Sequence, residues 1–103
     1  MSPALHIVFL PSAKADIQSA IEWYESRQYE MGKKFKTEVV RAIDSMPDPV
    51  KGYAPVYMNL SRVFVKKFPY VIYFKMDTDR NRLVIYAVLH KKQNRENILK
   101  KRV

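Results

Sequence analysis

Cysteine is absent from the 103-residue chain, and glycine and histidine occur only twice each. Without cysteine there is no disulfide scaffold, thiolate metal site or cysteine nucleophile, which fits a reducing compartment. Two glycines cannot build a glycine-rich loop around a phosphate, and histidines at positions 6 and 90 have no metal-ligand spacing. We therefore expect neither a metal nor an organic cofactor.

Long apolar runs are also lacking. No apolar run approaches the roughly 20 residues that span a bilayer, and Met1–Ala4 lacks the basic and apolar parts of a secretory signal. We expect a cytoplasmic protein that makes no membrane contact. Because 48% of the residues are hydrophobic and 13% aromatic, we expect one domain, residues 1–103, with a polar, basic tail over about 94–103.

Acidic residues are scarce in the second half of the chain. Residues 1–52 hold seven bases and seven acids, whereas residues 53–103 hold twelve bases and three acids, so the whole net charge of +9 lies there. Segregated charge of this kind favours a phosphate-rich or strongly acidic partner. Lysines that protect an exposed sheet edge from aggregation would account for one or two of these twelve bases. The candidate polyanion-binding residues are Lys66, Lys67, Lys91, Lys92, Arg95, Lys100, Lys101 and Arg102.

Apolar residues spaced three and four positions apart predict two helices. The first covers about residues 13–28, with Ser12 as its cap and Asp16 near its positive end. The second carries an apolar stripe from Met31 to Met46 and ends at Pro47-Asp48-Pro49. The short link between them predicts an antiparallel helical hairpin.

Segments of β-type composition predict four strands, at residues 5–10, 62–68, 70–76 and 83–89. The order β-α-α-β-β-β predicts an α+β fold: an N-terminal strand, the helical hairpin, then a three-stranded antiparallel meander, with the helices on one face of a mainly antiparallel sheet. Alternation along 62–68 mixes apolar and basic residues on both faces, so it does not decide which face meets the helices. The expected core is Ile7, Phe9, Ile17, Ile21, Tyr24, Phe35, Val39, Ile43, Ile72, Phe74, Ile85 and Ala87.

His90 is the first candidate for chemistry, because it ends the last predicted strand and precedes two lysines. A histidine there can act as an acid or base on a phosphate-bound substrate. It can equally be a structural residue that bonds a neighbouring backbone group, and the pattern leaves both interpretations open. His6 lies inside an apolar run and is predicted to be structural. No Asp or Glu occurs between Asp48 and Asp77, so that stretch supplies no carboxylate base.

A series of short elements runs along nearly the whole chain. None is specific alone, but their order and spacing resemble the RelE/ParE superfamily of bacterial toxins from type II toxin–antitoxin systems, and most closely its ParE-like branch. The elements are Ala15-Asp16-Ile17, Trp23-Tyr24, Gly32, Phe35, Pro49, Arg62, Phe68-Pro69-Tyr70, Ile72-Tyr73 and Val88-Leu89-His90.

The resemblance implies a growth-arresting toxin that a cognate antitoxin neutralises, as in plasmid stabilisation. RelE-like members cut messenger RNA on the ribosome, whereas characterised ParE members poison DNA gyrase. Arg62 looks similar to the arginine that holds the scissile phosphate in the ribonucleases, and His90 to their general acid. The glutamate base that some members carry before that arginine is missing from residues 53–61. This departure favours the gyrase-poisoning type.

Three functions therefore compete: a toxin that binds gyrase, a ribosome-dependent endoribonuclease that uses Arg62 and His90, and a nucleic-acid-binding module without toxicity. Only the second is an enzyme. Charge complementarity predicts an antitoxin with an acidic toxin-binding segment. That segment is expected either in a groove beside the helical hairpin or along the sheet edge.

Overall fold

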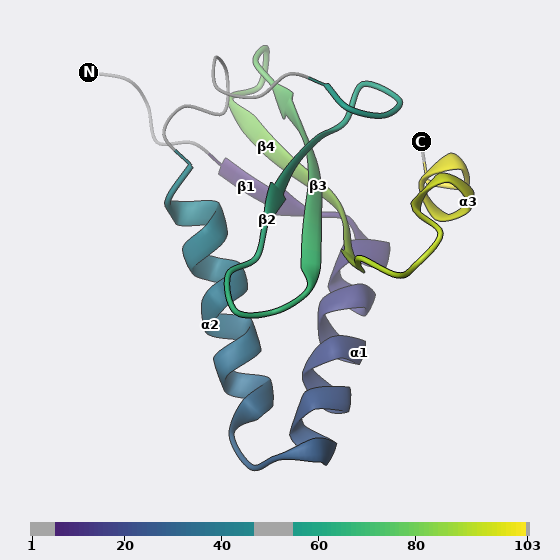
Figure 1. The fold of residues 1–103 in the computed structure, drawn as a ribbon. Coiled ribbons are helices and arrows are strands. Elements are labelled where there is room, and N and C mark those ends of the chain that lie inside the picture. Colours follow the sequence, from purple (N-terminus) through teal and green to yellow (C-terminus); the bar gives the residue numbers. More distant parts are fainter. Residues whose placement is uncertain (1–5, 47–54, 103) are drawn as a thin grey trace.

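The computed structural model describes residues 6–46 and 55–102 and has an α+β fold, as predicted (Figure 1). A helical hairpin lies on one side of a four-stranded sheet, and a short third helix follows the last strand. In these residues no helix is long and apolar enough to cross a membrane. The elements are β1 (His6–Phe9), α1 (Pro11–Arg27), α2 (Met31–Asp44), β2 (Ser61–Phe64), β3 (Tyr70–Asp77), β4 (Arg82–His90) and α3 (Arg95–Lys100).

The sheet has the strand order β1-β4-β3-β2. Strands β2, β3 and β4 form the expected antiparallel meander, whereas β1 pairs in parallel with β4, from His6 opposite Arg82 to Phe9 opposite Ile85. The sheet is therefore mixed, with β1 and β2 at its edges. The place of β1 beside the last strand depends on contacts more than seventy residues apart, which no local pattern encodes.

Each face of the sheet carries its own apolar core. Helices α1 and α2 cover one face, where Phe35 and Val39 pack with Ile72, Phe74 and Ile85. A smaller core on the other face joins the sheet to α3: Val71, Tyr73, Ala87, Leu89 and Leu99. Most of the expected core is confirmed. Ala87 is buried as expected, but in the smaller core.

The faces of β2 are settled by the strand's two valines. Val63 and Val65 pack toward the helices. The strand ends at Phe64 rather than continuing to Phe68, because Lys67 adopts a left-handed conformation with φ of 69° in the turn that follows. The predicted strand over 62–68 was therefore too long, and the lysines after Phe64 lie in a turn.

Two further expectations were wrong at the start of the chain. Ile7 is 41% exposed rather than buried, because the edge strand β1 has a neighbour on one side only. Ser12 does not cap α1: the cap residue is Leu10, with no side-chain bond, and Pro11 occupies the first turn, where its fixed φ is favourable. Asp16 consequently lies beyond the first turn.

Pro47-Asp48-Pro49 lies outside the described residues, and α2 ends at Asp44.

The hairpin depends on a close approach at Gly32. A Cβ there would lie 2.6 Å from the backbone oxygen of Ile21 in α1. The Glu25 carboxylate also accepts the backbone N–H groups of Glu30 and Gly32, each at 3.0 Å. It thereby satisfies donors that the start of a helix leaves unpaired. Glycine and glutamate together set how α2 begins.

We expect Gly32→Ala to destabilise the fold. The overpacking costs about 1–3 kcal/mol, against the roughly 1 kcal/mol that alanine gains over glycine inside a helix. Urea unfolding should show a lower midpoint for this variant, with Lys36→Ala, at an exposed position of the same helix, as the control. An unchanged midpoint would mean that the helices do not meet at this distance.

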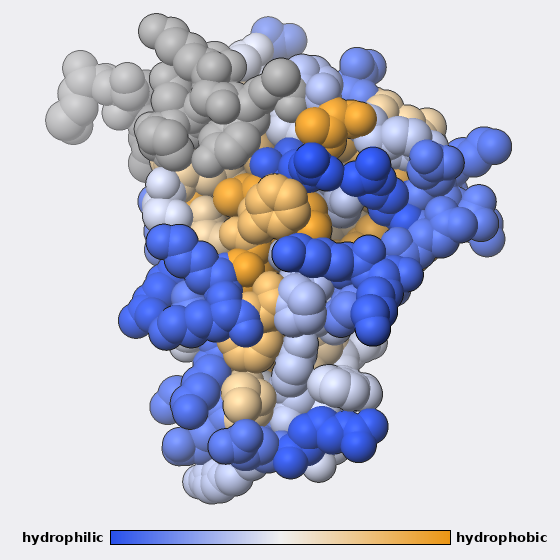
Figure 2. Space-filling model, in the orientation of Figure 1, coloured by the Kyte–Doolittle hydropathy of each residue, from blue (hydrophilic) through white to orange (hydrophobic). Residues whose placement is uncertain are grey.

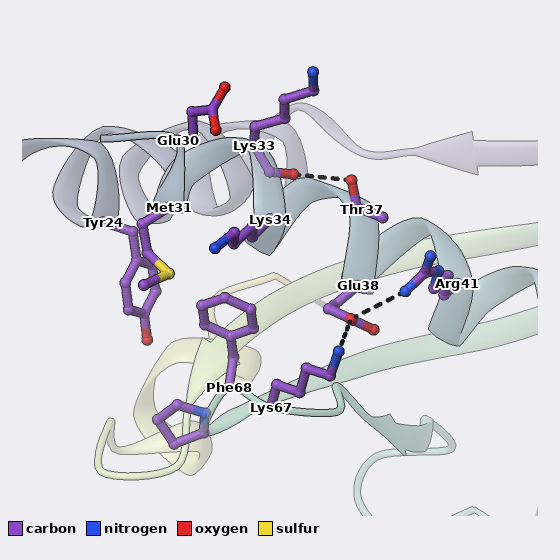
Figure 3. Close-up of a pocket in the computed structure, with 11 residues that line it drawn as sticks. Tyr24, Glu30, Met31, Lys33, Lys34, Thr37, Glu38, Arg41, Lys67 and Phe68 are labelled. Atoms are coloured by element: carbon purple, nitrogen blue, oxygen red, sulfur yellow. Dashed lines mark hydrogen bonds and ion pairs between the residues drawn. The ribbon is translucent and has the colours of Figure 1, made fainter. Parts of the chain in front are cut away.

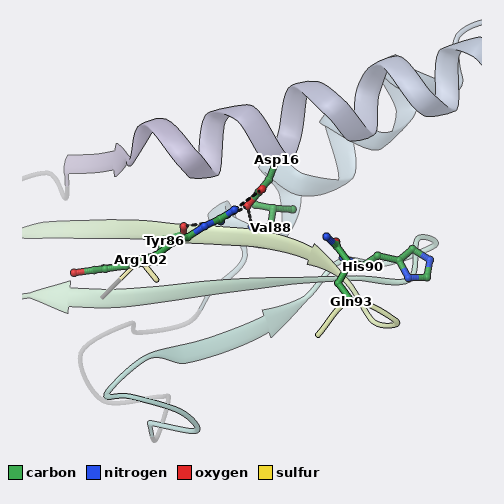
Figure 4. Close-up of polar contacts among 6 residues, drawn as sticks. All are labelled: Asp16, Tyr86, Val88, His90, Gln93 and Arg102. Carbon is green, nitrogen blue, oxygen red and sulfur yellow. Dashed lines mark hydrogen bonds and ion pairs between the residues drawn. The ribbon is translucent and has the colours of Figure 1, made fainter. Parts of the chain in front are cut away.

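Strand β4 contains a bulge at Tyr86. Ala87 pairs with Tyr73 and Ile85 pairs with Phe74, which leaves Tyr86 as the extra residue. Beyond Ile85, β1 has ended, so β4 has no strand on that side. The backbone groups there bond side chains instead: Asp16 accepts the Val88 N–H at 3.0 Å, and Arg102 donates to the Tyr86 carbonyl at 3.3 Å (Figure 4).

Asp16 and Arg102 also bind each other through two contacts, Nη1 to Oδ2 at 2.5 Å and Nη2 to Oδ1 at 2.9 Å. Their side chains are only 14% and 19% exposed. Bidentate pairs of this kind combine strength with a specific geometry. The pair joins α1, the open side of β4 and the residues after α3.

The basic tail is thereby folded. Asn94 accepts the Asn97 N–H and caps α3, and Leu99 is completely buried in the smaller core. Leu99, Ile98 at the edge of the same core, and the Arg102 ion pair place α3 over the sheet. Asn94, Leu99 and Arg102, all in the predicted tail, therefore have structural roles.

A double-mutant cycle between Asp16→Ala and Arg102→Ala tests the pair. Removing one partner of a buried pair leaves the other unpaired, and we expect a coupling energy of about 1–3 kcal/mol because both side chains are partly exposed. Chemical unfolding of the four proteins gives this value directly. Purely additive effects would show that the two residues act independently.

Candidate functional site

A hollow of about 330 Å³ lies between the outer face of β2 and β3 and the start of α3. We call it the β2–α3 hollow. Figure 2 shows the face of the molecule that carries β2 and α3, where apolar atoms are bordered by strongly hydrophilic side chains. Its lining residues are Arg62, Phe64, Val71, Tyr73, His90, Lys91, Gln93, Asn94, Arg95 and Glu96.

Strand register places the two candidate catalytic residues on opposite faces of the sheet. Arg62 lies opposite Tyr73 on β3, and Tyr70 of β3 lies opposite His90 on β4. The turn after β4 then carries Lys91, and α3 brings Arg95 back over the sheet. Tyr73 lies in the smaller core and Tyr70 packs on the core under the helices. Arg62 therefore faces α3, and His90, 28 positions later, borders the same hollow from the end of β4.

Phe64 is the apolar element of the hollow. Its ring is 51% exposed, and two cations lie within cation–π range: the Arg62 guanidinium carbon at 5.2 Å and Lys91 Nζ at 5.4 Å from the ring centroid. The sequence analysis assigned Phe64 no role. Its position beside Arg62 on the outer face of an edge strand was the only signal.

His90 is held from several sides. Its Nδ1 accepts the backbone N–H of Lys92 at 3.0 Å, its own N–H donates to the Gln93 side chain at 2.7 Å, and its ring packs edge-on against Tyr70. Because Nδ1 is an acceptor, the neutral ring carries its proton on Nε2. His90 thus makes the backbone contact of the structural interpretation and still has an N–H donor for a ligand.

Glu96 is a residue that sequence reasoning missed. The stretch before Arg62 carries no carboxylate, whereas α3 carries Glu96 to the hollow from 34 positions after Arg62. Glu96 is the only acid after Asp79 in the chain, and this was the available signal. The hollow therefore contains an arginine, a histidine and a carboxylate.

The other candidate polyanion-binding residues lie elsewhere. Lys92, Lys100 and Lys101 are exposed outside the hollow, and Arg102 is bound to Asp16. Lys66 and Lys67, in the turn after β2, line a groove of about 610 Å³ along α2. The basic half of the chain thus divides among several surfaces instead of forming one.

A larger groove of about 730 Å³ lies between α2, the end of α1 and the β2–β3 turn (Figure 3). We call it the α2 groove. Tyr24, Met31 and Phe68 supply apolar surface. At its other end the buried Glu38 carboxylate binds Arg41 at 3.3 Å and Lys67 at 3.4 Å. The pair with Lys67 joins the turn after β2 to α2, whereas the pair with Arg41 lies within α2.

A third groove, of about 690 Å³, runs along α1 past Tyr24 and Tyr70 to His90. Burial raises the pKa of both tyrosines above the ordinary value, and repulsion from Asp16 and from Tyr24 in its ionised form raises the pKa of Tyr70 further. Both phenols are therefore neutral at physiological pH. In residues 6–46 and 55–102, no cluster of three or more His, Asp or Glu side chains could hold a metal ion.

Comparison with known proteins identifies the family. The family model for the ParE toxin of the parDE type II toxin–antitoxin system matches residues 7–95. A solved structure, the chromosomal ParDE toxin–antitoxin system from P. aeruginosa, has a similar fold: the TM-score is 0.72 at 13% identity, over 84% of this chain and 95% of that one. None of the curated proteins matches the sequence significantly. The chain belongs to the ParE toxin family of type II toxin–antitoxin systems.

Proposed function

We propose that this protein is a growth-arresting toxin that binds and poisons DNA gyrase in the cytoplasm, and that residues 1–103 act as one toxin domain. The supporting observation is the family match over residues 7–95, since characterised ParE members poison gyrase. Such a toxin acts by binding and needs no chemistry of its own.

One observation favours a second candidate, a ribosome-dependent endoribonuclease. Arg62, His90 and Glu96 line the same hollow, and cleavage of RNA needs a phosphate-holding cation, a proton donor and a base. Against it, the carboxylate comes from α3 and not from the stretch before Arg62, where some ribonuclease members carry it. We therefore favour gyrase binding over RNA cleavage as the function of this protein.

The proposed antitoxin partner carries an acidic, amphipathic segment that occupies the α2 groove. The groove offers apolar surface at Tyr24, Met31 and Phe68, and lysines at Lys33 and Lys34 on its border. An amphipathic helix uses such a groove through its apolar face, while acidic side chains meet the lysines. The solved relative is described as a ParDE system, which supports a toxin–antitoxin complex.

Induced expression in a bacterial host tests the proposal, with two readouts: supercoiling of a reporter plasmid and mapping of transcript ends. We expect growth arrest, altered supercoiling and intact transcripts. The His90→Ala variant should remain fully toxic, because a toxin that acts by binding gyrase uses no proton transfer from His90. For a nuclease, His90→Ala and Arg62→Ala would each lower cleavage by about 10²–10⁴-fold.

The control is copurification with the coexpressed antitoxin, which should be retained by the wild-type chain and by each variant and so show that they fold. Transcript cleavage that disappears in folded His90→Ala would overturn the gyrase proposal in favour of the ribonuclease. Absence of growth arrest would favour a nucleic-acid-binding module without toxicity.

A further inference from the structure

Trp23 is an aromatic side chain that the fold leaves half outside. It is 52% exposed and belongs to neither apolar core. The ring is nevertheless held in place: it packs edge-on against Tyr24, with the ring centroids 5.0 Å apart, and the Arg27 guanidinium carbon lies 4.8 Å from its centroid. A fixed, exposed tryptophan beside an arginine is typical of the residues that dominate the binding energy of protein interfaces.

Trp23 ends an exposed row of side chains along α1. Ala15, Ser19 and Trp23 are four positions apart, so they share one face of the helix, and all three are exposed. They form one wall of the groove of about 690 Å³ that passes Tyr24 and Tyr70, which we call the α1 groove. Figure 4 shows part of the opposite wall, where Val88 and His90 lie at the end of β4. The two small side chains leave room for a partner's side chains to reach Trp23.

The α1 groove differs in charge from the other hollows. Among the described residues that line it there is no lysine or arginine, whereas at least two line each of the β2–α3 hollow, the α2 groove and the groove at Lys66. Its one carboxylate, Asp16, is bound to Arg102, and its two tyrosines are neutral. The groove therefore offers no cation to a nucleic acid or an acidic peptide, and it matches an uncharged, apolar surface of another protein.

The α1 groove adjoins the α2 groove. Tyr24 and Pro69 line both of them, so an antitoxin segment in the α2 groove would reach the border of the α1 groove. A toxin that acts by binding is neutralised when its antitoxin overlaps the surface that meets the target. The α1 groove fulfils this condition for an antitoxin seated on α2.

We propose that the α1 groove is the surface that binds gyrase, and that it receives the uncharged, apolar face of a gyrase helix, which packs along Ala15 and Ser19 and against Trp23. The inference rests on the proposed function, because it takes gyrase as the target. A helix that lays its apolar face into a groove is a common mode of protein recognition. A second copy of this chain is disfavoured as the occupant, because two molecules that each carry a net charge of +9 repel each other.

Biolayer interferometry with the full chain and purified gyrase holoenzyme tests the proposal, beside a supercoiling assay on the same samples. We expect Trp23→Ala to weaken gyrase binding by about 30-fold or more, the loss expected for a tryptophan anchor near the centre of an interface. Its effect on supercoiling should fall in parallel. Copurification with the coexpressed antitoxin should be retained, because Trp23 does not line the α2 groove.

A second variant blocks the α1 groove and leaves Trp23 in place. Ser19→Arg puts a bulky charge into the groove at an exposed position, and it should weaken gyrase binding by a similar factor because an unpaired charge is costly to bury.

Each variant has a matched control. Gln18→Arg adds the same charge one position away on α1, at an exposed residue outside the groove, and should bind gyrase as the wild type does. Tyr29→Ala removes an aromatic ring that is 75% exposed outside the groove and should also have no effect. Thermal unfolding checks that all four variants are folded.

Three results would overturn the proposal while wild-type binding keeps gyrase as the target: equal gyrase affinity of folded Trp23→Ala and wild type, equal affinity of Ser19→Arg and Gln18→Arg, or a wild-type dimer in sedimentation that Trp23→Ala converts to a monomer. The last would assign the groove to a second copy. Wild-type protein that neither binds gyrase nor alters supercoiling would instead contradict the proposed function, and this inference with it.

Discussion

The ion pair between Asp16 and Arg102 joins α1 to the residues after α3 across the open side of β4. Strand β1 ends before β4 does, and the bulge at Tyr86 falls where β4 has lost its neighbour. The pair satisfies the backbone groups exposed there, since Asp16 accepts from Val88 and Arg102 donates to Tyr86. Without it, α1 would lie beside a strand with unpaired polar groups, which are costly when buried.

The β2–α3 hollow depends on the same contacts. One of its walls is the sheet face that carries Arg62 and Phe64, and the other is the turn and helix that carry Lys91, Arg95 and Glu96. That second wall is held over the sheet by buried Leu99 and by Arg102. A short helix is marginal by itself in water, so these two side chains help to keep Arg95 of α3 at the hollow.

Local patterns predicted the hairpin and the meander, because the 3.6-residue period of a helix and the 2-residue period of a strand are visible in the spacing of nearby apolar residues. They missed features that depend on distant partners. Arg102, one of the predicted polyanion-binding residues, binds Asp16, 86 positions away. Glu96 reaches the site only because α3 folds back. The strand pattern around Phe64 does not tell whether its side chain is exposed or buried. Its exposure is explained only by the position of β2 at the edge of the sheet.

Hydrogen exchange of the Arg102→Ala protein tests the central claim most directly, because it reports the stability of each element separately. We expect the protected amides of α3 to exchange roughly 10- to 100-fold faster than in the wild type, in line with the loss of a largely buried ion pair, while the β3 amides keep most of their protection. Unchanged protection of α3 would contradict the account, because the helix would then be held in place without the ion pair.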